Sequence, residues 1–185
     1  MLVKFVGSRD GDGQYFHYVT KWMFALNRMS VARGDRKYNN LAIQLAESTY
    51  PHFVYNRNSS HPRMFWKISI DMKNPAVPSE GNLGIIHFFS LCNTFLDPYD
   101  GLVTFRILQE TSGKADILQK EISELERMVN NKFQQYDSDD PLDLGESLWI
   151  SHWFPSEKWS ETLASRASSS LEDLWNQGYF DAPIR

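Results

Sequence analysis

Apolar residues recur every three or four positions along most of this chain, which is the period of an amphipathic helix. Two such series precede residue 56, and Gly34-Asp35 separates them. Glycine ends helices in a left-handed conformation, and aspartate caps the helix that follows. The pattern therefore predicts a helical hairpin over about residues 13–55. The apolar positions are Phe16, Val19, Trp22, Met23 and Leu26, then Tyr38, Leu41, Ala42, Leu45, Ala46 and Phe53.

The same alternation of apolar helix and polar turn occurs twice more. Ser112-Gly113 divides the second pair of helices, and Pro155-Ser156 divides the third, where Ser156 is a candidate cap. Two helices joined by a short turn form an αα-hairpin. We therefore predict an all-α fold of three hairpins, at about 13–55, 100–134 and 142–178, in one domain over residues 1–185.

A long connection, residues 56–99, joins the first hairpin to the second. Only Met64 to Asp71 has the look of an extended strand, and Pro75 and Pro78 end it. Connections of this length are uncommon in compact domains and are often functional. We expect this connection to contribute to a site.

Each predicted hairpin begins at a turn rich in aspartate. The three turns are Asp10 to Gln14, Asp97 to Leu102 and Asp140 to Gly145. Helix capping explains them, because Asp accepts hydrogen bonds from free N–H groups and suits the positive end of the helix dipole. A second interpretation is that the first helices all point the same way in a ring, so that these turns gather on one rim of a shared cavity.

Charge and composition exclude several classes of protein. The formal net charge is −4, and the charges are interspersed, so the basic patch of a nucleic-acid binder is missing. A single cysteine, Cys92, cannot form an internal disulfide and favours a reducing compartment. The longest apolar run, Leu83 to Leu96, is too short to span a bilayer. We expect a soluble cytoplasmic protein with neither a membrane nor a nucleic-acid partner.

The aromatic fraction of 14% can fill a core or provide flat faces that stack on sugar rings. The histidines lack the four-residue spacing of a helical zinc motif, and the glycines do not form a phosphate loop. We expect no metal and no cofactor.

The first hairpin also carries a resemblance. The run Asp-Gly-Gln-Tyr-Phe-His-Tyr within Asp10 to Trp22, followed by Gly34-Asp35 and Tyr38, resembles a hairpin of the six-hairpin glycosidase-like superfamily. That superfamily includes N-acylglucosamine 2-epimerase-like proteins and several glycoside hydrolase families. A microbial branch of it has similar segments in the same order, here Pro62 to Asp71, Val77-Pro78-Ser79 and Asp97 to Thr104.

The resemblance implies an α/α toroid, of which three hairpins make about half, with a sugar or glycoside in its cavity. The stretch 82–95 departs from that branch, and it is an insertion, a buried segment or a translated intron. With three hairpins instead of six, we expect a fragment of a glycoside hydrolase or sugar epimerase, inactive alone. Its open helical flanks would favour self-association. The alternative is a non-catalytic remnant or interaction module that uses exposed aromatic flanks.

Two chemistries fit the predicted rim. Glycoside hydrolysis needs a pair of carboxyl groups, for which Asp12, Asp100 and Asp143 are the candidates. Proton abstraction beside a carbonyl needs a base with a pKa near neutrality, for which His17 is the candidate. Capping by the aspartates and a core role for His17 are the structural alternatives. The candidate substrate-binding residues are Gln14, Tyr15, Trp22, Arg63, Trp66, Lys67 and Tyr99.

Overall fold

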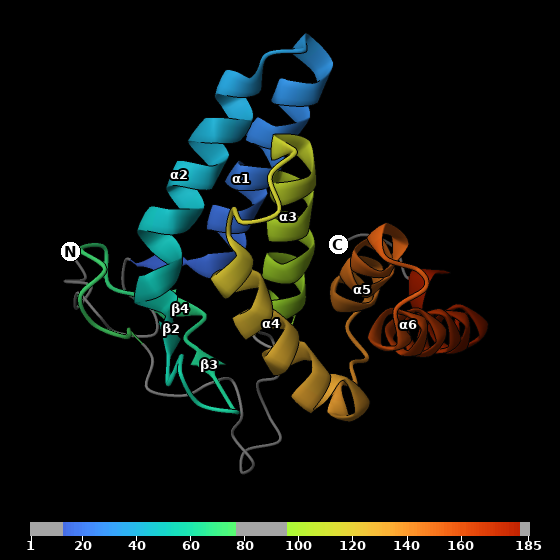
Figure 1. The fold of residues 1–185 in the computed structure, drawn as a ribbon. Coiled ribbons are helices and arrows are strands. Elements are labelled where there is room, and N and C mark those ends of the chain that lie inside the picture. The colour runs from blue at the N-terminus through green and yellow to red at the C-terminus, as the bar shows by residue number, and fades with distance from the viewer. Residues whose placement is uncertain (1–12, 77–95, 182–185) are drawn as a thin grey trace, which may run out of the picture. The chain divides into compact units, whose positions relative to one another are not determined.

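A computed structural model describes residues 13–76 and 96–181, and within them the protein is mostly helical, as predicted (Figure 1). The described helices are α1 (Phe16–Arg33), α2 (Arg36–Phe53), α3 (Asp97–Ser112), α4 (Gln119–Lys132), α5 (Pro141–Trp153) and α6 (Lys158–Asn176), with short 3-10 helices η1 (Phe133–Gln135) and η2 (Tyr179–Asp181). The strands are β1 (Gln14–Tyr15), β2 (Val54–Tyr55), β3 (Arg63–Met64) and β4 (Lys67–Ile68).

The chain divides into two compact units. The N-terminal unit extends to Met128 and the C-terminal unit begins at Val129, so α4 crosses the division. No described helix combines the length and the apolar character needed to cross a membrane.

The predicted turn of the first hairpin is confirmed. Gly34 ends α1 with a φ of 65°, a left-handed conformation that residues with a side chain rarely adopt, and its N–H bonds to carbonyl groups of the last helical turn. The Asp35 carboxylate then accepts from the backbone N–H of Lys37 at 2.9 Å and caps α2. Two adjacent residues therefore stop one helix and start the next.

The later helix ends confirm some predicted turns and correct others. Gly113 ends α3 with a φ of 71°, and Asp140 caps α5 by accepting from the N–H of Leu142 at 2.8 Å. Asp97 does not cap α3, because it lies inside the first turn and Leu96 occupies the cap position. Ser156 does not cap α6, because the helix begins later, after Glu157. The first aspartate turn lies mostly outside the described residues.

The core of the N-terminal unit is an aromatic cluster shared by α1, α2 and α3. The Phe16 ring meets the edge of Phe53 at 5.2 Å, and Tyr50 meets Phe105 at 5.3 Å. All four side chains are fully buried. Trp22, predicted on the same apolar face of the first helix, is instead 69% exposed. A helix turns about 100° per residue, so Trp22 points away where its neighbour Met23 is buried.

The first helices of the first two hairpins, α1 and α3, run parallel. Thr20 of α1 contacts Asp100 near the start of α3, and Asn27 of α1 donates to Thr111 near its end at 2.8 Å. In Figure 1, α2 lies alongside both helices in the opposite direction. Because α1 and α3 are parallel, their N-terminal turns lie at the same end of the unit.

The long connection folds back onto that end of α1. The predicted extended segment forms two separate strands: β3 pairs with β2, and β4 pairs with β1, both antiparallel. The N–H of Phe16 donates to the carbonyl of Trp66 at 3.0 Å, which ties the connection to the first turn of α1. Pro75 bridges Ile68 and closes the segment. The apolar stretch 82–95 lies outside the described residues.

In the C-terminal unit, α5 and α6 pack through small side chains. Ser160 of α6 donates to the carbonyl of Ser151 on α5 at 2.8 Å, and both residues are buried. Short side chains let the two helices approach closely. Arg166 donates to the carbonyl of Tyr136 at 2.6 Å, which fixes the segment that leads into α5.

Candidate functional site

A buried carboxylate, Asp100, is the centre of the candidate site. It lies in the first turn of α3, and three side chains of α1 surround it. The Thr20 hydroxyl donates to Oδ2, Lys21 Nζ lies 2.9 Å from Oδ1, and His17 Nδ1 lies 3.5 Å from Oδ2. Positions 17, 20 and 21 share one face of a helix, since residues three and four apart are neighbours there. We call these four residues the Asp100 cluster.

The residue after Asp100 allows this close contact between α1 and α3. A Cβ atom at Gly101 would lie 2.9 Å from Cε1 of Phe16 and 3.2 Å from a methyl carbon of Leu125. Cβ atoms in proteins essentially never lie as close as 2.9 Å to another atom, so the neighbours of an added Cβ atom would have to shift. The missing side chain therefore lets α3 approach α1, and Asp100 meets the first turns of α1.

The Asp100 cluster combines a buried acid with a half-exposed base. The Asp100 side chain is 1% exposed, and that of His17 is 32% exposed. Donors from Thr20 and Lys21 suit the carboxylate form of Asp100. A carboxylate beside Nδ1 favours the histidine tautomer that carries its proton there, which makes Nε2 the basic nitrogen. This arrangement can orient a general base for proton transfer.

An aromatic layer adjoins the cluster at the same end of α1. The Tyr15 ring lies 5.4 Å from Tyr18 and 5.5 Å from Trp66, centroid to centroid. Lys67 Nζ lies 4.9 Å from the centre of the Tyr15 ring, within the range of a cation–π contact. The Lys67 stem passes against Gly13, where a Cβ atom would lie 2.7 Å from the lysine Cε. These contacts hold Tyr15 in place.

The structure brings several predicted residues together and separates others. Those gathered at the N-terminal end of α1 are Gln14, Tyr15, His17, Trp66, Lys67 and Asp100. Trp22 lies farther along α1, and Arg63 is an exposed residue of β3, paired with Tyr55 of β2.

Three residues predicted to bind substrate are buried. Lys67 is 0%, Tyr99 is 1% and Trp66 is 8% exposed, so all three lie behind the surface rather than on it. Lys67 supports the Tyr15 ring from inside, a role that the sequence pattern did not indicate. Asp12 lies outside the described residues.

Asp143, the third aspartate proposed for catalysis, belongs to the C-terminal unit. It lies in the first turn of α5, and Ser138 donates to it at 3.0 Å. Burial raises the pKa of the Asp143 carboxyl above its usual range, and the nearby carboxylates of Asp140 and Glu146 raise it further. A raised pKa is what a general acid needs.

Sequence reasoning did not select Thr20 and Lys21, two close partners of Asp100. The signal for them was present, since both lie about one turn from His17 on the same face of the predicted helix. His17 and Asp100 carry atoms that a metal could use, but the lysine ammonium already lies against Asp100 Oδ1.

No protein-family model, no curated protein and no solved structure matches this chain. The resemblance to the six-hairpin superfamily therefore stays a prediction from the quoted sequence segments.

Proposed function

We propose that the N-terminal unit binds a sugar or glycoside at the N-terminal end of α1, and that its hairpins belong to an α/α toroid of the six-hairpin kind. The contact between the first turns of α1 and α3 is the observation that carries the proposal. It joins Thr20 to Asp100, 80 residues later in the chain. Parallel first helices with adjoining N-terminal turns are what a ring with one functional rim requires.

Aromatic and polar groups suited to a sugar lie close together on this end of the unit. Tyr18 is 63% exposed and packs against both Tyr15 and His17. A sugar ring can stack its C–H face on such a ring while its hydroxyl groups bond to polar side chains. His17 and Lys21 are both about one third exposed and can meet those hydroxyls.

The chemistry favours proton transfer by His17 over hydrolysis by a carboxyl pair. Asp100 is buried and paired with Lys21, which suits an orienting carboxylate better than an acid that touches the glycosidic oxygen. His17 is the exposed member, and Asp100 beside Nδ1 prepares Nε2 to accept a proton from carbon next to a carbonyl. We therefore place the proposed activity closer to sugar epimerisation than to glycoside hydrolysis.

The first experiment tests binding. Ligand-observed NMR with a panel of monosaccharides and a glycan array should detect saturable binding to the full chain. Tyr18→Ala and Asp100→Asn should each weaken sugar binding about tenfold, which corresponds to a loss of about 1–2 kcal/mol of binding free energy. The first variant removes the stacking ring, and the second removes the charge that orients His17 and Lys21. Trp175→Ala removes an equally exposed aromatic residue of the C-terminal unit and should leave binding unchanged. Undiminished binding in both site variants would contradict the assignment.

The second experiment tests proton transfer. A bound reducing sugar incubated in D₂O should exchange its proton beside the carbonyl, visible by NMR. His17→Asn should abolish the exchange while sugar binding persists. His52→Asn is the control, because His52 is an exposed residue of α2 outside the cluster. Binding without exchange in the wild-type chain would support a non-catalytic sugar-binding protein.

A protein-interaction module is the second candidate. Tyr18, Trp22 and Met29 lie along one face of α1 and are all exposed. Apolar side chains gathered on a helix face are typical of interaction surfaces. If this interpretation holds, Trp22→Ser should reduce self-association in sedimentation velocity and leave sugar binding intact.

A further inference from the structure

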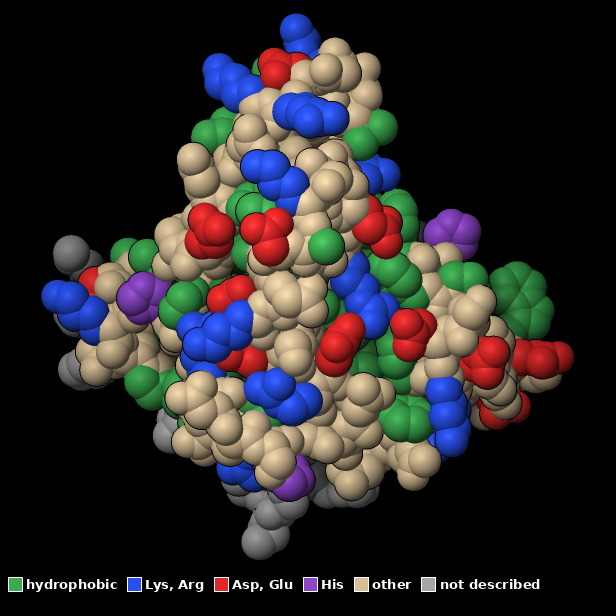
Figure 2. Space-filling model, in the orientation of Figure 1, with side chains coloured by type: hydrophobic (Ala, Val, Ile, Leu, Met, Phe, Trp, Pro, Cys, Tyr) green, Lys and Arg blue, Asp and Glu red, His purple; other side chains and the backbone are tan. Residues whose placement is uncertain are grey.

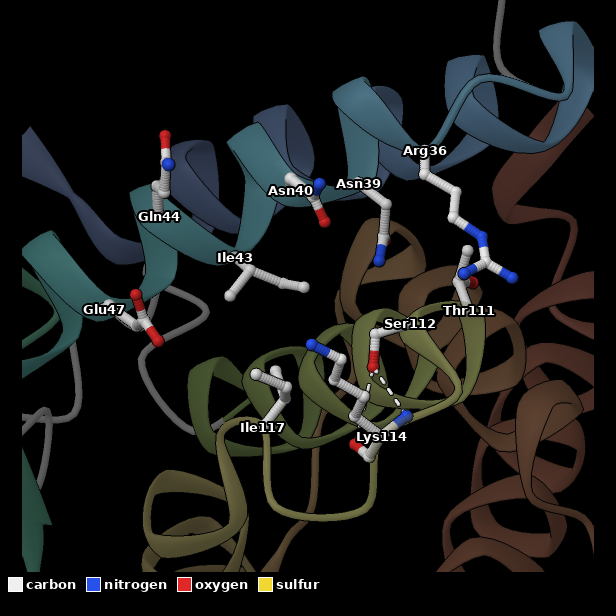
Figure 3. A pocket seen from close by; sticks show the side chains of 10 residues that line it. All are labelled: Arg36, Asn39, Asn40, Ile43, Gln44, Glu47, Thr111, Ser112, Lys114 and Ile117. Carbon is white, nitrogen blue, oxygen red and sulfur yellow. Dashed lines mark hydrogen bonds between the residues drawn. The ribbon is translucent and has the colours of Figure 1, made fainter.

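A groove opens at the other end of α3, away from the Asp100 cluster. It lies between α2 and the α3–α4 connection and has a volume of about 350 Å³ (Figure 3). Thr111 lines it, 11 residues after Asp100, which is about 16 Å along a helix. The volume is at the lower end of small-molecule sites. The groove is therefore separate from the proposed sugar site and large enough for a small metabolite.

Two cations line the groove. Arg36 of α2 and Lys114 of the connection both contribute to its wall, and Figure 3 shows the Lys114 side chain directed into the space. Among the described residues, neither forms an ion pair within 4.0 Å. Of the described residues that line the groove, Glu47 alone is acidic, and it lies at the opposite end from Arg36 (Figure 3). The Arg36 end therefore has a local positive potential.

The surrounding surface adds to that potential. Figure 2 shows basic side chains gathered over the α1–α2 turn, next to the Arg36 end of the groove. Three positive charges lie in this turn, those of Arg33, Arg36 and Lys37. The turn has one carboxylate, Asp35, which accepts a hydrogen bond from the first turn of α2. A positive potential of this kind raises the local concentration of anions.

Buried hydrogen bonds hold the walls of the groove in place. Asn27 donates to both Asn39 and Thr111 at 2.8 Å, and Asn39 donates to the Leu108 carbonyl at 3.0 Å. This network fixes the floor between α2 and α3. Walls that are rigid before binding reduce the entropy lost when a ligand is captured.

The connection that carries Lys114 is held in the same way. The Gln109 side-chain amide donates to the carbonyl groups of Ala115 and Ile117, both at 2.8 Å. The Lys114 N–H donates to the Ser112 hydroxyl at 3.1 Å. Lys114 therefore projects from a loop that several hydrogen bonds hold in place.

From this geometry we infer a second binding site, specific for a small polar anion whose phosphate or carboxylate lies between Arg36 and Lys114. Arg36 would bind two oxygens with its planar guanidinium group, and Lys114 would add a point charge. Beyond the anionic group, Asn40 offers an amide to hydroxyl groups, and Ile43 and Ile117 offer a short apolar wall (Figure 3). The ligand class is a phosphorylated or carboxylated polyhydroxy compound.

The test measures binding of four probes to the full chain by calorimetry and NMR. Glucose 6-phosphate and gluconate distinguish a phosphate from a carboxylate ligand, inorganic phosphate tests the anion alone, and glucose tests the neutral part. At least one anion should bind saturably at the groove, and glucose should not compete with it. Arg36→Gln and Lys114→Gln should each weaken binding about tenfold, as expected for a charge-assisted contact.

Matched variants separate this site from general charge effects. Lys73→Gln and Lys120→Gln remove exposed lysines that neither line the groove nor belong to the α1–α2 turn, and they should leave binding unchanged. Asn40→Phe fills the groove without changing its charge and should abolish binding. The inference is overturned if no anion binds, if binding survives the double variant, or if both lysine controls weaken it equally. Asp100→Asn should not affect this binding, so the test of the anion site is independent of the test of the proposed sugar site.

Discussion

At the scale of a single residue, Gly101 decides how closely α1 and α3 approach. Its missing side chain leaves room for Phe16, which is itself held by the rings of Tyr50 and Phe53. The neighbours are buried and cannot move aside without disturbing that cluster. The Asp100 cluster therefore depends on the absence of one methyl group at the next position.

Gly101→Ala should lower the free energy of unfolding by about 1–3 kcal/mol, because an added atom overpacks a filled core. Gly145→Ala is the matched control. Gly145 is an exposed helical residue where an added Cβ would meet no atom within 4 Å, so alanine should stabilise by about 0.5–1 kcal/mol. Urea denaturation of both variants measures the difference. Equal effects at the two positions would show that the core around Phe16 is not tightly packed.

At the scale of the helix, the ends of the elements are set by one or two local residues. Asp35 and Asp140 cap α2 and α5 through their carboxylates. Leu96 and Glu157 occupy the same position in α3 and α6 without a side-chain hydrogen bond. Aspartate in the turn before a helix is therefore a cap in some hairpins of this chain and not in others.

Asp140→Ala should destabilise the C-terminal unit by about 1 kcal/mol, since the N–H groups of Leu142 and Asp143 lose their acceptor. Asp139→Ala removes the same charge one residue earlier, at an exposed position outside the cap, and should have little effect. Thermal unfolding of the two variants checks this. If the Asp139 variant is equally destabilised, charge and not capping is responsible.

At the scale of the whole molecule, the chain holds two compact units with separate cores. The core of the N-terminal unit centres on aromatic residues such as Phe16, and that of the C-terminal unit on Leu163, Ile150 and small side chains. The proposed sugar site and the proposed anion groove both belong to the N-terminal unit. Its stability therefore controls both proposed activities.

Because the two units have separate cores, a core substitution in one unit should reduce protection from amide hydrogen exchange in that unit alone. Phe16→Ala should cost about 3–5 kcal/mol and raise amide hydrogen exchange in α1 to α3, and Leu163→Ala should cost about 2–5 kcal/mol and raise it in α5 and α6. Hydrogen exchange followed by mass spectrometry distinguishes the two patterns, and each variant is the control for the other. Increased exchange throughout both units in either variant would indicate one cooperative unit.

Much of the helical structure could be predicted because it depends on local rules. The period of apolar residues located the hairpins, and the turns at Gly34 and Gly113 followed from the left-handed backbone that glycine permits. The same rules could not distinguish Trp22, which is exposed, from Met23, which is buried. Periodicity locates an apolar face but does not say which neighbour covers each part of it.

Local patterns in the chain were enough to establish the helical class, the turns at Gly34 and Gly113, and a short set of polar candidates that included His17 and Asp100. The three-dimensional packing was needed to show that these two meet, that Thr20 and Lys21 join them, and that Lys67 lies beneath the Tyr15 ring. These two kinds of feature differ in how far apart in the sequence the interacting residues lie. Helix periods and caps are set within a few residues, whereas a contact across 80 residues depends on how closely two helices pack, which here rests on Gly101.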